Sequence, residues 1–237
     1  RMYALQLLLV PLMLLAFYRA WHRGQPRWWV FFVVTSVLGA YTQYFTFLLI
    51  AGLHVVVLLD RERLGVRWRQ LLLADLAILA LFSPQALLLL GQIGIALASD
   101  WVSPDPVYLI KALHMLILSY SLPPSAVAAG FFVTLSLAVI ATYQMILALR
   151  QDEHHAERPA LLLVLMTLWS PLLLVATLAV VNPFFLPFRS LTVVLPSYIV
   201  LLAYGSGRVQ LRSPQPILYA VLGVLIFLSL GHYFFAP

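Results

Sequence analysis

Long apolar runs separated by short polar loops make up almost the whole chain. Runs of about 16 to 22 residues match the length that an α-helix needs to cross a bilayer core of about 30 Å. The pattern therefore predicts an all-α fold, a polytopic transmembrane helix bundle that forms one integral-membrane domain over residues 1–237. The runs expected to be single spans are residues 3–18, 71–90, 126–149, 160–181, 191–204 and 217–235.

One apolar run, residues 28–59, is too long for a single span. Its 32 residues would form a helix about 48 Å long, and basic loops on both sides of it require an even number of crossings. We therefore expect two short spans with a turn between Gly39 and Phe45. The prediction is eight spans in all. Residues 108–122 have a short and broken apolar stripe, which favours an interfacial helix.

Basic residues are distributed unevenly between the loops. Of the 14 Lys and Arg residues, 11 lie in four loops, and only Arg1, Lys111 and Arg189 fall in the alternate loops. Because cytoplasmic loops carry an excess of basic residues, the four basic loops should face the cytoplasm and both chain ends the opposite side. These four loops are residues 19–27, 60–69, 150–158 and 207–213.

The composition excludes a soluble protein, since 63% of the residues are hydrophobic, 9% are charged, and the mean hydropathy is +1.00. The net charge of +6 is explained by the topology signal and by contact with anionic lipid headgroups. It does not indicate binding of nucleic acid, because the arginines lie at span ends. The absence of cysteine excludes disulfides, thiol nucleophiles and thiolate metal sites. The chain starts at Arg1 without an initiator Met, so we expect natural N-terminal residues to be missing rather than a signal peptide to be present.

Two polar features have structural explanations. Residues 152–155, Asp-Glu-His-His, resemble a metal cluster, but adjacent histidines in a polar loop offer no defined coordination geometry, which favours a solvated loop. Asp75 lies within an apolar run, where an ionisable residue is a functional candidate. It is close to the basic loop, and we predict that it pairs with Arg67 or Arg69.

Two other features suit recognition of a ligand. Arg189 contradicts the charge rule and follows an aromatic, proline-broken segment; it either grips a phosphate bidentately or extends to the membrane interface. Tyr41, Gln43 and Tyr44 place hydrogen-bonding groups and two rings at an outward turn, which suits a sugar or a lipid headgroup. Anchoring in an aromatic belt explains the two tyrosines equally well.

An ordered set of short motifs resembles a known family. The motifs are Arg-Met-Tyr-Ala-Leu at 1–5, Tyr-Thr-Gln-Tyr-Phe at 41–45, Trp101 with Pro104, and Pro-Phe-Arg-Ser-Leu at 187–191 before Leu195-Pro196. In order and spacing they are similar to the polyprenyl-phosphate-dependent C-type glycosyltransferases, in particular bacterial protein mannosyltransferases and the lipid A aminoarabinose transferase. Gln43 stands where that family more often has histidine, which leaves an amide that can still hydrogen-bond a sugar.

The resemblance implies transfer of a sugar from a polyprenyl-phosphate donor to a glycan, lipid or protein acceptor on the extracytoplasmic face of a bacterial inner membrane. It implies phosphate contacts from Arg1, Lys111 and Arg189. The sugar or acceptor cavity would be lined by Tyr3, Tyr41, Gln43, Tyr44 and Trp101. The family's catalytic aspartate lies upstream of the Arg-Met-Tyr motif, so the chain corresponds to a C-terminal part with no catalytic residue of its own and no activity alone. No cofactor beyond the lipid-linked sugar is implied, and a need for divalent metal stays open.

Other classes of membrane protein share some of these features. A secondary transporter or lipid flippase also has many spans and a few misplaced charges, but it tends to show broken spans in two halves and ionisable residues near the midplane. A noncatalytic membrane scaffold subunit fits the isolated chain as well. Acidic residues in an outward loop upstream of Arg1 would favour the enzyme.

Overall fold

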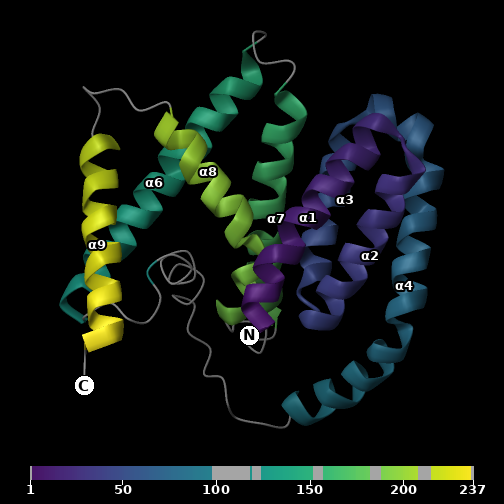
Figure 1. The fold of residues 1–237 in the computed structure, drawn as a ribbon, viewed down its shortest axis with the longest axis horizontal. Coiled ribbons are helices and arrows are strands. Elements are labelled where there is room, and N and C mark those ends of the chain that lie inside the picture. Colours follow the sequence, from purple (N-terminus) through teal and green to yellow (C-terminus); the bar gives the residue numbers. More distant parts are fainter. Residues whose placement is uncertain are drawn as a thin grey trace. The chain divides into compact units, whose positions relative to one another are not determined.

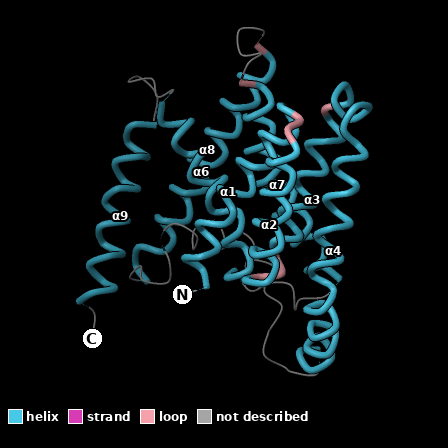
Figure 2. Tube along the Cα trace, turned by 45° about the vertical axis from the view of Figure 1, so that its right-hand side comes forward, coloured by secondary structure: helices cyan, strands magenta, loops and turns pink. Residues whose placement is uncertain are grey.

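The computed structural model describes residues 2–97, 118, 124–151, 157–181, 188–207 and 215–235. Every regular element in these ranges is helical, which confirms the all-α prediction (Figure 1, Figure 2). The elements are α1 (Met2–Arg23), α2 (Pro26–Thr42), α3 (Thr46–Leu59), α4 (Arg61–Leu97), α6 (Pro124–Arg150), α7 (Arg158–Val181), the 3₁₀ helix η3 (Phe188–Val194), α8 (Leu195–Gly207) and α9 (Gln215–Phe235).

The helices have the length and composition of membrane spans. Within the described residues, four segments are long and apolar enough to cross a bilayer: Ala4–Arg23, Arg63–Leu89, Ala126–Arg150 and Arg158–Thr177. Three more helices are apolar but shorter, namely Thr46–Leu59, Leu191–Gly207 and Gln215–Leu230. Leucines of α4 such as Leu73 and Leu87 are exposed, a surface that lipid tolerates and water does not. The chain is therefore an integral membrane protein.

The chain divides into two compact units. Unit 1 consists of residues 1–104 and 166–196, and unit 2 consists of residues 105–165 and 197–237. Unit 1 holds α1 to α4, the later part of α7, and η3. The part of the predicted site that the structure describes lies in unit 1. The predicted interfacial helix, residues 108–122, lies outside the described residues apart from Leu118, and the loop 152–155 lies outside them entirely.

The predicted break in the long apolar run is confirmed. Helix α2 ends at Thr42, and Gln43 adopts an extended backbone whose N–H donates to the carbonyl of Gly39. The carbonyl of Gln43 in turn accepts the N–H and the hydroxyl of Thr46, which begins α3. These bonds satisfy backbone groups that the helix ends leave without intrahelical partners. The polar residues of the turn therefore divide one apolar run into two helices.

An aromatic core joins α1 to α2 at the end of unit 1 where the α1–α2 loop lies. The Phe17 ring lies 5.4 Å from that of Phe32 and 6.0 Å from that of Trp21, measured between centroids. All three side chains are almost fully buried. Gly24, with φ +69°, makes the sharp turn between the two helices, a conformation that favours glycine. The turn allows the apolar faces of α1 and α2 to pack against each other.

The predicted basic loop 60–69 is wrong apart from Asp60, because residues 61–69 are the first turns of α4. Asp60 alone separates α3 from α4. Arg, Glu and Leu are compatible with helix and the segment contains no proline, and the bonds that Asp60 and Arg67 make with α1 hold the start of α4 in place. The helix also continues beyond the predicted end at residue 90, through Gly91 and Gly94. These glycines were expected in the following loop.

The predicted pairing of Asp75 with Arg67 or Arg69 is also wrong. The guanidinium of Arg67 donates to the carbonyls of Ala20 (2.7 Å) and His22 (3.1 Å), where it caps the end of α1. Arg67 and Asp75 are eight residues apart, about 12 Å along the helix axis. Asp75 instead bonds to His54 of α3, with 2.9 Å between Oδ2 and Nε2.

Unit 2 is held together by tyrosine hydroxyls and by a close helix approach. Tyr198 of α8 donates to the carbonyl of Thr134 in α6, and Tyr219 of α9 donates to the carbonyl of Leu202 in α8. A Cβ at Gly205 would lie 2.7 Å from Cβ of Ala141, so only glycine fits where α8 meets α6. Small residues at such crossings are typical of membrane helices.

Candidate functional site at the α2–α3 turn

The structure describes some of the predicted site residues and not others. Tyr41 lies in the last turn of α2, and Gln43 and Tyr44 form the turn that follows this helix. Tyr3 lies in α1 and Arg189 in η3, where the structure describes their backbone positions. The remaining three predicted contacts, Arg1, Trp101 and Lys111, lie outside the described residues.

A chain of hydrogen bonds connects α1, the α2–α3 turn and η3. Nε2 of Gln6 donates to Oγ1 of Thr46 (2.7 Å), and this hydroxyl donates to the Gln43 carbonyl (2.8 Å). On the other side, the hydroxyl of Thr192 in η3 donates to Oε1 of Gln43 (3.2 Å). We call Gln6, Gln43, Thr46 and Thr192 the turn network. It fixes the Gln43 side chain between two other elements of unit 1.

Burial makes this network energetically important. Gln6 and Thr46 are both 0% exposed, and the second polar atom of Gln6, Oε1, has no partner among the described residues. A buried amide is costly unless its groups are bonded. Sequence reasoning missed both residues. The available signal was a single amide, Gln6, within the apolar run 3–18.

The two tyrosines of the turn have different surroundings. The hydroxyl of Tyr41 donates to the carbonyl of Leu81 in α4 (3.0 Å), and its ring meets Phe82 edge-on at 5.7 Å. Tyr41 therefore links α2 to α4. Its contact with a sugar or acceptor stays a prediction. The Tyr44 ring lies tilted against the Phe45 ring, with 4.6 Å between centroids, and burial raises the pKa of the Tyr44 phenol. The phenol of Tyr44 thus stays neutral and can donate a hydrogen bond.

Three segments that the motifs singled out converge at one end of unit 1. The start of α1, which carries Tyr3, packs beside η3, which carries Arg189 (Figure 1). Helix α3 also contacts η3, and the α2–α3 turn bonds to it through Thr192. Residues separated by nearly 190 positions in the sequence are therefore brought to one place, as a common binding site requires.

The opposite end of unit 1 is charged, and the carboxylate of Asp60 there is already paired. Asp60 accepts hydrogen bonds from the Trp21 indole and the Arg63 guanidinium, both at 2.9 Å. Burial alone would raise the pKa of Asp60, but these two donors outweigh it and lower the pKa below its ordinary value. The bonds link the ends of α1, α3 and α4, which is a structural role.

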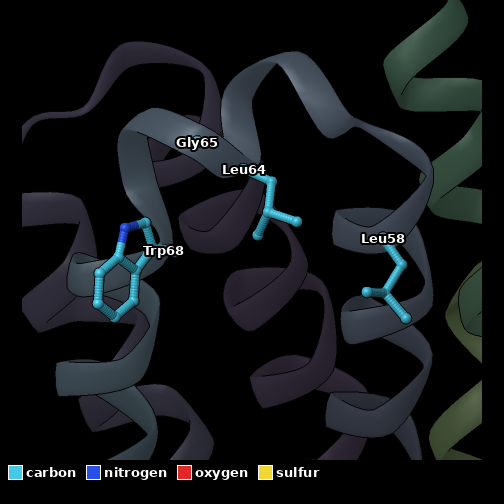
Figure 3. A pocket seen from close by; sticks show the side chains of 4 residues that line it. All are labelled: Leu58, Leu64, Gly65 and Trp68. Atoms are coloured by element: carbon cyan, nitrogen blue, oxygen red, sulfur yellow. The ribbon is translucent and has the colours of Figure 1, made fainter.

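Two apolar cavities lie away from the turn network. One, of about 790 Å³, lies between α3 and α4 and is lined by Leu58, Leu64, Gly65 and Trp68 (Figure 3). The other, of about 520 Å³, lies between α2 and α4 beside Trp29 and Gln70. Neither contains a predicted site residue. Among the described residues no group of three or more His, Asp or Glu side chains could hold a metal ion.

Residues 3–88 match the sequence profile of the dolichyl-phosphate-mannose-protein mannosyltransferase family. The resemblance to C-type glycosyltransferases is confirmed. The matched segment covers α1 to α3 and most of α4, and it includes Tyr3, Tyr41, Gln43 and Tyr44. No curated protein and no solved structure matches the chain. The match supports a membrane glycosyltransferase of the C type as the class of protein.

Proposed function

We propose that this protein transfers a sugar from a polyprenyl-phosphate donor to an acceptor on the extracytoplasmic face of a bacterial inner membrane. The observation that carries the proposal is the family match over residues 3–88 in a segment that folds around the turn network. The ordered motifs also imply a polyprenyl-phosphate donor. The acceptor is a glycan, a lipid or a protein that presents a hydroxyl or amine.

The donor phosphate binds where the start of α1 meets η3. We assign its contacts to Arg189, supported by Arg1 and Lys111, because a guanidinium binds phosphate bidentately. During transfer the acceptor oxygen or nitrogen forms a bond to the anomeric carbon and gives up its proton to a general base, while the bond between the anomeric carbon and the phosphate oxygen breaks. The leaving polyprenyl phosphate gains negative charge, which fixed cations stabilise.

The sugar lies against the turn. Its hydroxyls meet the Gln43 amide and the Tyr44 phenol, and Tyr3, Tyr41 and Trp101 complete the cavity. Oε1 of Gln43 already accepts a bond from Thr192, so the turn network fixes the orientation of this amide before the donor binds. A side chain that is already oriented loses less entropy on binding and holds the sugar in a defined position.

Donor-dependent kinetics of Arg189 variants in the full-length protein test the proposal. Arg189→Ala should raise the activation free energy of transfer by about 1.5–3 kcal/mol, the range for a charge-assisted hydrogen bond. This change lowers kcat/KM for the polyprenyl-phosphate sugar by roughly 10- to 150-fold. Arg189→Lys keeps the charge but loses the planar fork, so it should recover only part of the activity. The matched control is Arg150→Ala at the end of α6, which should leave the kinetics unchanged.

Two results would count against the proposal. Near-wild-type kinetics for Arg189→Ala would remove this residue from the phosphate site and leave Arg1 and Lys111 as candidates. A protein that binds polyprenyl phosphate but transfers no sugar from any such donor would contradict the enzymatic assignment itself and favour a lipid flippase.

A further inference from the structure

His54 and Asp75 form a polar pair within the apolar stretches of two helices. Nε2 of His54 in α3 lies 2.9 Å from Oδ2 of Asp75 in α4. Nδ1 of the same ring lies 2.8 Å from the carbonyl oxygen of Ile50, one turn earlier in α3. Ionisable side chains within membrane helices are costly, and those that occur are paired and commonly functional. Neither residue belongs to the turn network or to the phosphate contacts.

The two short contacts determine how many protons the pair holds. The Ile50 carbonyl can only accept, so Nδ1 must carry a proton. The Nε2–Oδ2 contact needs a second proton, which lies either on Nε2 as part of an imidazolium or on the carboxyl of a neutral Asp75. Both arrangements have zero net charge. Removal of one proton leaves a net charge of −1 and only one hydrogen on the ring, so one of the two bonds is lost.

We propose that His54 and Asp75 together form a site for one proton, which locks α3 to α4 within the membrane. An apolar environment disfavours the net negative charge that follows proton release. The protonated pair therefore satisfies both requirements of its position, neutrality and complete hydrogen bonding. The proposal rests on this geometry and does not depend on the proposed function.

No other ionisable group among the described residues shares the contact. The nearest along α4 is Arg69, six residues before Asp75 and about 9 Å away along the axis; its guanidinium lies over the Trp68 ring. Asp60 bonds to Trp21 of α1 and to Arg63 of α4. Arg67 bonds to two backbone carbonyls of α1. The other ionisable residues on the surrounding elements, at or near their ends, are Tyr3, Tyr18, Arg19, His22 and Arg23 on α1, Arg27 and Tyr41 on α2, Tyr44 in the turn, Arg61, Glu62 and Arg63 on α4, Arg158 on α7 and Arg189 on η3.

A route for the proton follows from exposure and helix periodicity. The side chains of His54 and Asp75 are 40% and 24% exposed, so the pair is reachable. Leu58 lies four residues after His54, and Trp68 seven residues before Asp75, on the same faces of their helices. Both line the cavity of about 790 Å³ between α3 and α4 (Figure 3). The cavity therefore lies one to two helical turns from the pair, on the side of the charged end of unit 1.

Proton release should loosen α3, which has 14 residues and begins at Thr46 of the turn network. Stability from the lock is complete below about pH 6.5, where an unfolded histidine also holds its proton, and is lost as the pH rises from there to the point at which the folded pair releases its proton. The isolated 237-residue chain in detergent is sufficient to test this, because no donor or acceptor takes part.

The deciding variant is Asp75→Asn. An asparagine amide donates to Nε2 of a neutral His54 while Nδ1 still donates to Ile50, so both bonds persist without a proton to lose. Between pH 7 and 10 the wild type should lose roughly 2–4 °C in Tm relative to Asp75→Asn, the scale of one lost hydrogen bond in a chain of this size. Asp60→Asn is the matched control and should keep the alkaline loss of the wild type.

A spectroscopic measurement covers the case in which Asp75→Asn folds poorly. In ¹⁵N-histidine NMR of the wild type, the His54 signals, identified by their loss in His54→Gln, should show a protonated Nδ1 at pH 7 and a change at alkaline pH. Parallel thermal profiles for the wild type and Asp75→Asn would overturn the proposal. An unprotonated Nδ1 at pH 7 would overturn it as well.

Discussion

The Thr46→Val substitution removes one hydroxyl from the centre of the turn network. Valine keeps the branched shape of threonine, but the Gln6 amide, which donates to this hydroxyl at 2.7 Å, then loses that acceptor. Both side chains are 0% exposed, so water cannot replace the bond. A buried donor without an acceptor costs about 1–3 kcal/mol, which corresponds to roughly 2–4 °C in Tm for each kcal/mol. The Gln43 carbonyl keeps its bond from the Thr46 N–H, so the turn itself should survive.

Thr35→Val is the matched control for this prediction. Thr35 is equally buried on α2, but its hydroxyl bonds to the carbonyls of Phe31 and Phe32 in its own helix. Loss of such a bond leaves no donor of another side chain unpaired and should change stability by less than about 0.5 kcal/mol. Thermal unfolding of both variants in the same detergent makes the comparison. Equal losses for the two would refute the energetic role of the network, and Thr46→Ser should restore most of the stability.

Three further predictions concern packing, pH and topology. Gly52→Ala should destabilise the protein by about 1–3 kcal/mol, because its Cβ would lie 2.5 Å from Oγ of Ser170, whereas Gly223→Ala, with open space around it, should not lower Tm. Because the pKa of Asp60 is lowered by its donors, its contribution is complete above about pH 3.9 and lost as the pH falls through the lowered value; Tm between pH 3 and 6 should therefore fall more in the wild type than in Asp60→Asn. Cysteines introduced one at a time into this cysteine-free chain should resist membrane-impermeant thiol reagents in intact cells, and labelling at two or more would refute the topology. The positions are Gln25, Gly65, His154 and Gln210.

Much of the fold could be predicted from the sequence, because length and hydropathy constrain membrane helices strongly. The break between α2 and α3 followed from the excess length of residues 28–59 and from the basic residues on both sides of it. The start of α4 at Arg61 could not be predicted from the same signals. Arginines at a membrane interface are compatible with a loop or a helix, and the choice depends on the bonds that Asp60 and Arg67 make with α1.

The candidate site was only partly accessible from the sequence. The motifs identified Tyr41, Gln43 and Tyr44, and the structure supplies the residues that hold them, which are as far away as Thr192. The partner of Asp75 required knowledge of which face of α3 meets α4, since His54 lies 21 residues earlier. Hydropathy gives the length of a helix, but its rotation about its own axis is set by packing against its neighbours.

Photo-cross-linking with a polyprenyl phosphate that carries a diazirine beside its phosphate tests the placement of the donor most directly. If the start of α1, the α2–α3 turn and η3 form the phosphate site, adducts that unlabelled polyprenyl phosphate competes away should map to residues 2–6, 41–46 and 188–194. Adducts confined to residues 61–69, the arginine-rich start of α4, would contradict this placement, because they would show that the lipid phosphate binds at the opposite end of unit 1.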